Sequence, residues 1–374
     1  MVCHFGKSVP MATTHNKDEG GLRQPRRQKP VSLGDIARVA GVSRMTVSCA
    51  LRNQPGVGEE KRQQIRQIAD EMGYIPDARL NNWMEAVRET KQRELMPIAW
   101  LNTDYKSKDC WHTYPYLAPY LEGAAQRAQE LGYRLEEIWT EQDGMTNRRI
   151  SQILYQRGIR GVIVAPPDGI DLGHIRLNWR HFSAATFERG LGSPRLSCVS
   201  QDFYSNVLLA LRVLRRAGYR RIGSVIGRQT DRRAQYAHQA VVGYFSSKVP
   251  AAERVPPFFH PSDMNRGEGF TQWLRKERVD VVVGQHSGLL DWVRAAGLRV
   301  PEDVGVAHLA VDGDCPDWAG IWAEKKEIGA ATVELVVRFL LAHQSGLPGV
   351  PRNVIIPGRW HGGNTVLIPK PAAP

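Results

Sequence analysis

The stretch Val31–Leu51, VSLGDIARVAGVSRMTVSCAL, predicts two short helices that meet at a tight turn. Ser32 and Asp35 have the spacing of a capping box, in which each side chain bonds the other residue's backbone N–H, so the first helix begins there. Its apolar residues recur at helical spacing as far as Gly41, which favours the left-handed conformation that ends a helix. Ser43 is a second N-cap only two residues later. We therefore expect a helix-turn-helix.

A third helix follows in the sequence. Apolar residues recur at helical spacing between Val57 and Gly73, namely at Ile65, Ile68, Ala69 and Met72. Three helices of this kind can share one small core. The helical spacing alone also fits a small hairpin in any all-α protein.

Residues 30–90 resemble the DNA-binding headpiece of the LacI/GalR family of bacterial transcription regulators. Three motifs carry the resemblance, which are DIARVAGVSRMTVS at Asp35–Ser48, VGEEKR at Val57–Arg62 and GYIP at Gly73–Pro76. In a helix-turn-helix the second helix lies in the DNA major groove, with its first residues at the base edges. The resemblance therefore implies sequence-specific binding to double-stranded DNA.

The resemblance also implies which side chains face the DNA. Arg44 would read base edges, because one arginine can donate two hydrogen bonds to a guanine, whereas Met45 and Cys49 offer soft apolar contacts. Cys49 stands where relatives often carry arginine, and its alternative role is a small, partly buried filler. Nearby hydroxyl groups would steady the phosphates. The predicted DNA-binding residues are Ser32, Ser43, Arg44, Met45, Thr46, Ser48, Cys49 and Trp83.

Residues 77–94 are expected to form a hinge helix and a polar linker. Asp77 can cap a helix here, but a helix this short is marginal alone. In the family, the hinge helix folds when it pairs with its dimer mate in the minor groove. The resemblance places Trp83 where a leucine usually wedges between base steps. The alternatives are that Trp83 packs against its own protein, or that Met84 inserts instead.

Composition and charge agree with a folded protein that has an anionic partner. The 374 residues, 42% of them hydrophobic, are enough for two or three domains. A formal net charge of +12 and a pI near 9.6 favour a phosphate backbone as partner. No apolar run approaches the roughly 20 residues of a membrane-spanning helix, and the N-terminus lacks the apolar segment of a secretory signal. We expect the protein in the cytoplasm and away from membranes.

Metals, disulfides and cofactors are not expected. The five cysteines are scattered and never form a CxxC pair, and the 11 histidines show no metal-ligand spacing. Residues 1–29 mix Gly, Pro, Gln and charge, which is typical of a disordered basic arm. This arm would contact phosphates, or it is a solvated tail or the product of a misassigned start codon.

From residue 95 onward, strands and helices alternate, as in parallel sheets with crossover helices. Strands are expected at 97–101, 160–165, 222–226 and 279–283, and helices at 120–131, 150–156, 207–217, 270–275 and 287–296. The runs LGY at Leu131–Tyr133, RAGYRRI at Arg216–Ile222 and VPEDVGV at Val300–Val306 resemble the family's effector domain. The predicted fold is therefore a small all-α headpiece at 30–76 and a two-lobed α/β, periplasmic-binding-protein-like domain at 95–374, which binds an effector and dimerises.

The effector site departs from that of the family's sugar-sensing members. Those members carry an arginine three residues before a Gly-aromatic pair, where this chain has Ala240, and an aspartate where this chain has His286. Alanine donates no side-chain hydrogen bond, and histidine cannot accept like a carboxylate. We expect a cleft of changed specificity whose candidate contacts are Trp111, Tyr114, Asp202, Gln285, His286 and Asp312. The alternative is an effector domain that only dimerises, in which His286 is structural.

No catalytic site is predicted. Ser287 is off-centre in the run GQHSG, so the spacing of a nucleophile elbow is absent. The run GEG at Gly267–Gly269 follows no predicted strand and lacks the third glycine of a dinucleotide site. The sequence favours a LacI-type DNA-binding regulator, most simply a repressor, that binds a pseudo-palindromic operator as a homodimer. A small-molecule effector, such as a sugar or a related metabolite, would control it. A ligand sensor without DNA binding is the other class, and the headpiece argues against it.

Overall fold

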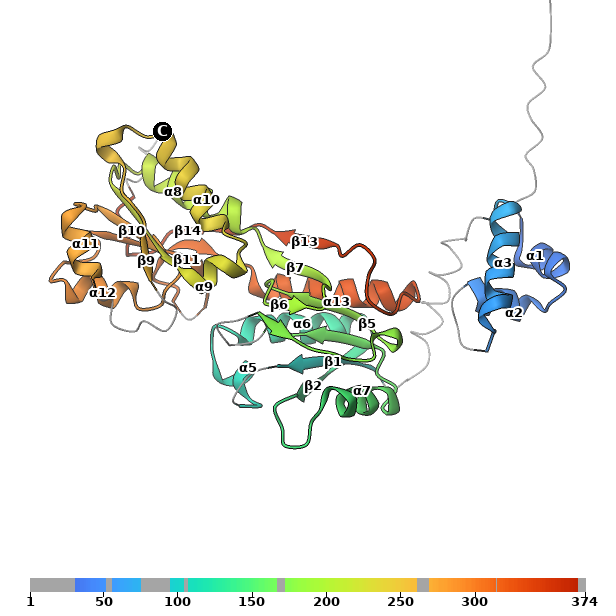
Figure 1. Ribbon diagram of the computed structural model, residues 1–374. Coiled ribbons are helices and arrows are strands. Elements are labelled where there is room, and N and C mark those ends of the chain that lie inside the picture. The colour runs from blue at the N-terminus through green and yellow to red at the C-terminus, as the bar shows by residue number, and fades with distance from the viewer. Residues whose placement is uncertain are drawn as a thin grey trace, which may run out of the picture. The chain divides into compact units, whose positions relative to one another are not determined.

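The computed structural model describes residues 31–51, 56–74, 95–103, 107–166, 172–260, 269–313 and 315–368 (Figure 1). These residues divide into two compact units, one within residues 1–85 and the other within residues 86–374. The predicted basic arm and the predicted hinge helix with Trp83 lie outside the described residues, so both stay predictions.

The first unit contains α1 (Leu33–Ala40), α2 (Arg44–Leu51) and α3 (Glu59–Glu71). The predicted capping box is confirmed, since Ser32 N donates to Asp35 Oδ2 at 3.0 Å and Asp35 N donates to Ser32 Oγ at 3.3 Å. Gly41 ends α1 in the left-handed conformation at φ 64°. Ser43 Oγ accepts from Thr46 N at 3.0 Å and so caps α2. The turn between α1 and α2 is therefore set by local hydrogen bonds that the sequence encodes.

The three helices share the predicted core. Ile36 on α1, Val47 on α2 and Ile65 on α3 are each 0% exposed and belong to one apolar cluster. Leu51 is only partly buried at the edge of this cluster. Arg44 and Met45, at the start of α2, lie outside this core and are exposed.

The second unit has two lobes, each built on a six-stranded sheet (Figure 1). The first sheet has the order β13-β7-β5-β3-β1-β2, and all its strand pairs are parallel. Its strands are β1 (Met96–Asn102), β2 (Tyr133–Trp139), β3 (Gly161–Val164), β5 (Ser183–Phe187), β7 (Ser197–Gln201) and β13 (Asn353–Ile356).

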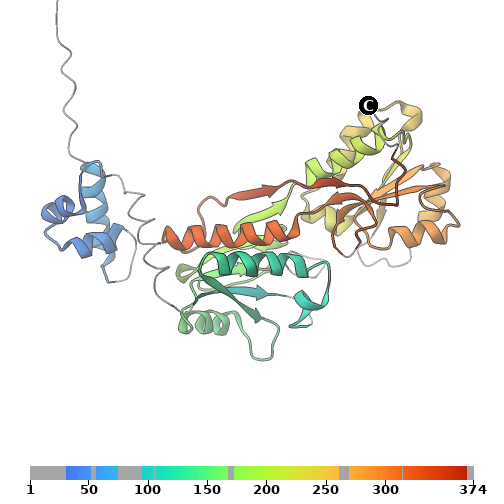
Figure 2. The same cartoon turned by 180° about the vertical axis from the view of Figure 1, so that it is seen from behind.

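Helices cover both faces of this first sheet. On one face lie α6 (Ala118–Glu130) and α13 (Lys325–Leu341), which run side by side in Figure 2. On the other lies α7 (Asn147–Gln156), whose Leu154 is fully buried. Alternate residues of β1 enter the two cores, since Trp100 packs with α6 and Leu101 with α7. The near-continuous apolar strands are thus those of a parallel sheet buried on both sides.

The second sheet has the order β14-β12-β11-β10-β8-β9, in which β14 pairs antiparallel with β12 and the other described pairs are parallel. Its strands are β8 (Ile222–Gly227), β9 (Phe258–His260), β10 (Val281–Gly284), β11 (Gly305–Val311), β12 (Ala319–Trp322) and β14 (Arg359–His361). One face packs against α8 (Phe203–Arg216) and α10 (Ala237–Ser247), the other against α11 (Phe270–Lys276) and α12 (Leu289–Ala295).

Short elements complete the second unit. They are α5 (Cys110–Thr113), α9 (Arg228–Arg233), the 3-10 helices η1 (Trp179–His181) and η2 (Ala251–Glu253), and the paired strands β4 (Gly173–His174) and β6 (Leu191–Ser193). The part of the chain that the structure describes contains no helix long and apolar enough to cross a membrane.

The chain passes between the two sheets three times, after β7, after β12 and after β13. Asn206, 2% exposed on α8, ties two of these passages together. Its Oδ1 accepts from Gly358 N at 2.9 Å, and its Nδ2 donates to Gln201 Oε1 at 3.4 Å. The buried side-chain amide of Asn206 thus connects the two segments in which the chain crosses between the sheets after β7 and after β13.

The predicted helices and strands of this unit are confirmed, with shifts of a few residues. The strand expected from Val279 begins at Val281, because Val279 N donates to Leu274 O and so ends the preceding helix. Asp280 Oδ2 accepts from Arg220 N at 2.7 Å and Arg221 N at 3.0 Å, which fixes the turn before the strand.

Candidate DNA-binding and effector sites

The headpiece places the predicted base-reading residues at the start of α2. Arg44 is exposed and Met45 is 75% exposed, whereas Cys49, one turn further on, is partly buried. The helix carries no acidic residue. The start of α2 therefore presents one cationic and one apolar side chain, Arg44 and Met45, to solvent. The arrangement fits insertion of the N-terminal end of α2 into a groove.

The predicted phosphate-contacting hydroxyls have local partners in the described structure. Ser32 Oγ donates to Asp35 Oδ2 at 2.6 Å, and Ser43 Oγ lies 2.8 Å from Thr46 Oγ1. Ser48 is partly buried on α2. The hydroxyls of Ser32 and Ser43 therefore act as helix caps, and any phosphate contact would add to that role.

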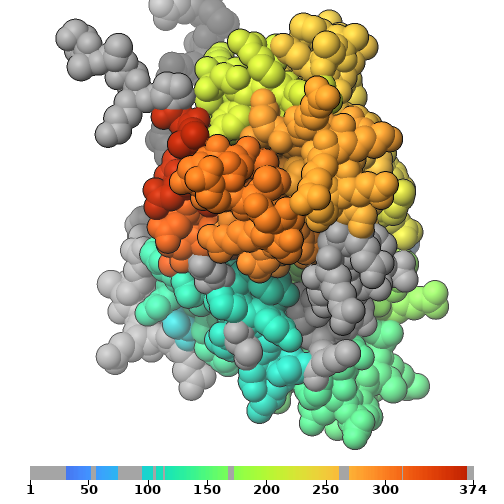
Figure 3. Space-filling view, turned by 90° about the vertical axis from the view of Figure 1, so that its left-hand side faces the viewer, coloured from blue at the N-terminus to red at the C-terminus, as the bar shows by residue number. Residues whose placement is uncertain are grey.

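A cavity of about 690 Å³ in the second unit is lined by residues that follow strands of both sheets. Figure 3 shows the face on which residues of α5 and α6 (teal) adjoin the second lobe (orange). Ligands of open parallel sheets bind at the carboxyl ends of the strands, which is where this cavity lies. We call it the effector cavity. Its lining is Trp111, Tyr116, Leu117, Tyr120, Pro166, Phe187, Glu188, Gln201, Phe203, Thr230, Arg233, Gln285, Ser287, His308, Ala310, Asp312, Cys315, Trp318 and Lys325.

Aromatic rings form one wall of the effector cavity. The ring centroids of Trp111 and Phe187 are 5.8 Å apart, and those of Tyr120 and Phe187 are 5.2 Å apart. Trp111 also packs edge-on against Trp100 at 5.0 Å. These mutual contacts bury the rings of Trp111 and Phe187 completely and fix an apolar wall before any ligand arrives.

Glu188 supplies a carboxyl group to the effector cavity. It accepts hydrogen bonds from Gln201 N at 3.3 Å and Gln201 Nε2 at 3.2 Å. Burial nevertheless raises the pKa of Glu188 above its usual range, against the opposing effect of these hydrogen bonds. Its backbone has φ 52°, a left-handed conformation that is strained for a residue with a side chain. Such strain is common at ligand sites.

His308 supplies a hydrogen-bond donor. Burial lowers its pKa to about 4, so the imidazole is neutral at pH 7. Its Nδ1 accepts from Ala310 N at 3.2 Å, which places the ring proton on Nε2. Among the residues that the structure describes, Nε2 makes no hydrogen bond of regular geometry, although the backbone of Gln285 lies close enough to the ring to oppose the fall in its pKa. The N–H is therefore available to an acceptor on a ligand.

Three of the six predicted ligand contacts line the effector cavity, namely Trp111, Gln285 and Asp312. The other three do not. Tyr114 is 41% exposed and packs against Tyr116, with ring centroids 5.7 Å apart. Asp202 caps α8, where its Oδ1 accepts from Ser205 N at 2.9 Å. His286 Nδ1 accepts from Gly288 N at 2.9 Å, and its ring lies 4.4 Å from that of Trp292.

The polar lining that sequence reasoning missed includes Glu188, Gln201, Arg233, His308 and Lys325. Glu188 and Gln201 stand at the ends of two strands that were not predicted. His308 lies only two residues beyond the VPEDVGV run, so the strand that run introduces was the available signal.

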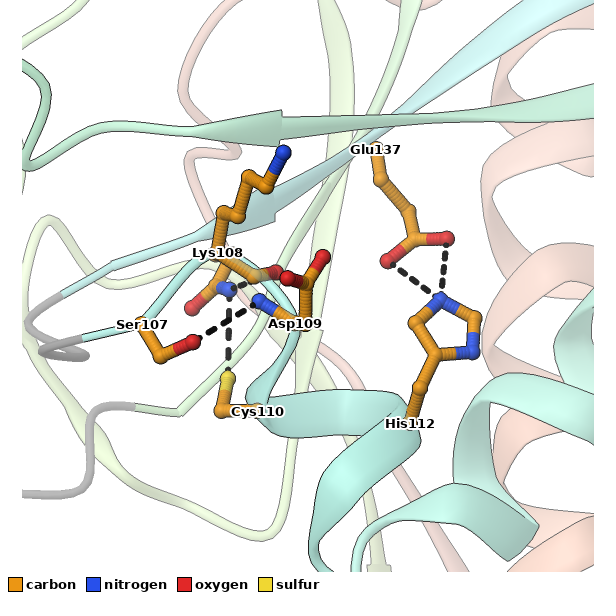
Figure 4. A network of polar contacts seen from close by, with 7 residues as sticks. Ser107, Lys108, Asp109, Cys110, His112 and Glu137 are labelled. Carbon is orange, nitrogen blue, oxygen red and sulfur yellow. Dashed lines mark hydrogen bonds and ion pairs between the residues drawn. The ribbon is translucent and has the colours of Figure 1, made fainter.

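A smaller polar pocket of about 460 Å³ lies at the ends of β1 and β2 (Figure 4). His112 Nε2 lies 2.9 Å from Glu137 Oε1, and Asn102 Nδ2 donates to Lys108 O and to Cys110 Sγ, both at 3.2 Å. The described residues include no group of three or more His, Cys, Asp or Glu side chains placed to hold a metal ion. The bonds from Asn102 tie the end of β1 to Lys108 and to Cys110 at the start of α5.

Comparison with known proteins agrees with this organisation. Residues 32–77 match the family described as bacterial regulatory proteins, lacI family. The chain is 22% identical to the transcriptional repressor PurR of Pasteurella multocida, over 82% of this chain and 90% of that protein. It is 24% identical to the transcriptional regulator GalR of Streptococcus thermophilus, over 83% of this chain and 93% of that protein.

A solved structure of the lac repressor dimer bound to operator and the anti-inducer ONPF shares the fold. It covers 91% of this chain and 100% of its own, with a TM-score of 0.51 and 16% identity. The predicted fold class, a helix-turn-helix headpiece followed by a two-lobed domain of the periplasmic-binding-protein type, is thereby confirmed. The chain therefore carries the helix-turn-helix domain of the lacI family of bacterial regulatory proteins and, over 91% of its length, has the fold of a regulator of that family.

Proposed function

We propose that this protein is a transcriptional repressor that binds a pseudo-palindromic operator as a homodimer under the control of a small-molecule effector. The observation that carries the proposal is the exposed start of α2, where Arg44 and Met45 stand beside a turn held by two capping serines. Two such helices related by a two-fold axis would each read one half-site. A regulator of this kind acts in the cytoplasm, where the DNA lies.

Each predicted headpiece residue keeps a distinct role in this proposal. Arg44 reads a base edge, and Met45 and Cys49 make apolar contacts. Ser32, Ser43, Thr46 and Ser48 carry the hydroxyl groups that would steady phosphates. Trp83, outside the described residues, is the candidate minor-groove wedge.

Control by an effector is supported by the effector cavity. A domain kept only for dimerisation would have no reason to place in one cavity a buried His308 N–H without a regular hydrogen bond and the carboxyl of Glu188, whose backbone is strained. A ligand that favours one arrangement of the two lobes would change DNA affinity, and DNA would change ligand affinity by the same factor.

The experiment that tests DNA binding is selection from a pool of random duplexes, followed by titration at several salt concentrations. Binding should weaken steeply as salt rises, because phosphate contacts release counterions. Arg44→Ala should lose about 1–3 kcal/mol of discrimination at one base position in each half-site. Arg38→Ala, an exposed arginine on α1, is the matched control and should keep the ranking of sequences. An unchanged ranking for Arg44→Ala would refute its base-reading role, and no salt-dependent duplex binding would refute the function.

A further inference from the structure

Two strained turns, one in each lobe of the effector domain, are joined by a hydrogen bond between their side chains. In the first lobe, Glu188 at φ 52° and Arg189 at φ 51° follow β5. In the second lobe, Gln235 at φ 55° and Tyr236 at φ 62° lie between α9 and α10. Six described residues other than glycine have a positive φ, and four of them stand in these two turns. Such strain persists only where neighbouring contacts enforce it, and it is common at switch regions.

The bond between the turns runs from Arg189 to Gln235, and we call it the interlobe bond. Arg189 Nη1 donates to Gln235 Oε1 in the other lobe. Its Nε donates to Ser200 Oγ, on β7 of its own lobe, at 3.3 Å. Because two nitrogens of one planar guanidinium are engaged, the side chain meets Gln235 in a fixed orientation. The charged donor also makes this bond stronger than one between two neutral groups.

Glu188 connects the same turn to the effector cavity. Its Oε1 accepts from Gln201 N at 3.3 Å, and its Oε2 accepts from Gln201 Nε2 at 3.2 Å. Both residues line the effector cavity. Ser200 and Gln201 are successive residues of β7, so the two side chains of the turn are bonded to adjacent positions of one strand. A ligand that contacts Glu188 therefore acts on the turn that carries Arg189.

The same hydrogen bonds continue to the segments in which the chain crosses between the sheets. Gln201 Oε1 accepts from Asn206 Nδ2, and Asn206 Oδ1 accepts from Gly358 N. A Cβ on Gly358 would lie 2.6 Å from Ile321 Cγ2 and 2.9 Å from Trp322 O, so the segment after β13 fits closely against the end of β12. A movement that separates the lobes bends the chain at these crossings and breaks the interlobe bond.

We propose that the interlobe bond is a latch that holds the two lobes in the described arrangement, and that an effector acts on this latch through Glu188. The latch itself stands on the contacts of the effector domain. The action of an effector rests on the proposed function. Because ligand and latch share one turn, a ligand that moves Glu188 changes the strength of the latch, and the latch changes ligand affinity by the same factor.

Hydrogen exchange of the full chain, measured by mass spectrometry without ligand, tests the latch. Gln235→Ala removes the acceptor, so the backbone amides of residues 187–190 in the other lobe should exchange at least about threefold faster, because their turn opens more often. Arg189→Gln should have the same effect on residues 234–237. A purely local role would change exchange only beside the substitution. The matched control is Gln272→Ala, an exposed glutamine on α11 of the second lobe, which should leave both turns unchanged.

Two further variants show whether the residues act through each other. Arg189→Gln/Gln235→Ala should lower the melting temperature by less than the sum of the two single changes, because each single variant already breaks the same bond. Gln235→Glu should slow exchange at residues 187–190, since the acceptor becomes charged. That protection should disappear when Arg189→Gln is added.

Glu188→Gln tests the link to the cavity. An amide offers one acceptor oxygen in place of two, so the backbone and side-chain N–H groups of Gln201 cannot both keep their bonds. Exchange at residues 234–237, in the other lobe, should therefore rise at least about twofold. Unchanged exchange there would overturn the link between the cavity and the latch.

The latch is overturned if Gln235→Ala and Arg189→Gln change exchange only in their own lobes, or if their effects on the melting temperature add. Operator binding by the same samples separates this outcome from the proposed function, because it depends on the headpiece. A protein that binds operator but shows no exchange between lobes that depends on these residues would refute the latch alone. The expected exchange changes in a protein that binds no duplex DNA would refute the proposed function alone.

Discussion

Lys325 Nζ forms an ion pair with Asp312 Oδ2 inside the effector cavity, although the two residues are only 7% and 6% exposed. Lys325 begins α13, which packs on the first lobe, and Asp312 follows β11 of the second lobe. Lys325 Nζ also donates to Tyr116 O at 3.0 Å. One ammonium group thus links residues of both lobes at the wall of the cavity.

Breaking this pair should destabilise the effector domain strongly. Lys325→Met removes the cation that faces the buried carboxylate of Asp312, which lowers the free energy of unfolding by about 3–5 kcal/mol. The double variant Lys325→Met/Asp312→Leu should recover most of that loss, because no charge remains buried. Urea denaturation, monitored by circular dichroism, measures the free energy of unfolding of the single and the double variant. A double variant as unstable as the single one would show that the pair does more than neutralise Asp312.

Two helical glycines should respond in opposite ways to alanine. On α6, a Cβ at Gly123 would lie 2.0 Å from Lys326 O, so α6 and α13 approach too closely for any side chain there. On α10, Gly243 is exposed and a Cβ there would meet nothing within 4 Å.

Gly123→Ala should therefore lower the free energy of unfolding by about 1–3 kcal/mol, because overpacking outweighs the better helix propensity of alanine. Gly243→Ala should raise the free energy of unfolding by about 0.5–1 kcal/mol, since only the helix propensity of this residue changes. Thermal denaturation of both variants and of the wild type measures these two changes in stability. Equal effects of the two substitutions would contradict the close helix contact.

His308 should make the effector domain less stable in acid. Its pKa is about 4 in the folded protein and about 6.5 when unfolded, so the unfolded chain binds the extra proton first. The contribution of neutral His308 to the free energy of unfolding is therefore fully present above pH 6.5. About 3 kcal/mol of it is lost as the pH drops to 4. Lys325 and Asp312 face the ring with opposite effects on its pKa.

Burial lowers the pKa of His238 as well, so the wild type alone does not isolate His308. His308→Gln keeps an acceptor for Ala310 N and removes the titrating ring. Denaturation between pH 7 and 4.5 should show a smaller loss for this variant. Parallel curves for the two proteins would mean that other groups cause the acid sensitivity.

The headpiece could be predicted almost completely because its signals are local. Ser32, Asp35, Gly41 and Ser43 fix the ends of helices through partners a few residues away. The alternation of helices and strands in the effector domain, though not every strand, followed from apolar periodicity in the same way. Element ends shifted where a tertiary bond intervened, as at Asp280.

The effector cavity was predictable only in part, because its chemistry depends on strands far apart in the sequence. SAATF and SCVSQ, which form β5 and β7, lack the β-branched runs that signal a strand, so Glu188 and Gln201 gave no sign of sharing a cavity. His286 was favoured by family spacing, yet it packs against Trp292, and His308 lines the cavity instead. Burial, which distinguishes the two histidines, is not encoded in spacing.

A ligand screen on the intact chain should separate these two histidines. Sugars, nucleosides and organic acids are tested by thermal shift, where a ligand at 100 times its dissociation constant adds about 2.7 kcal/mol of stability. Gln285→Ala and His308→Gln, both at cavity-lining positions, should weaken any ligand found.

His286→Ala is the matched control for this screen, since its ring bonds Gly288 N and lies against Trp292 instead of lining the cavity. It should lower stability without changing ligand affinity by more than about twofold, because losing packing affects the free and bound protein alike. If His286→Ala weakens binding as much as His308→Gln does, then the ligand reaches beyond the cavity to the end of β10. If all three variants bind like the wild type, the effector site lies elsewhere in the domain.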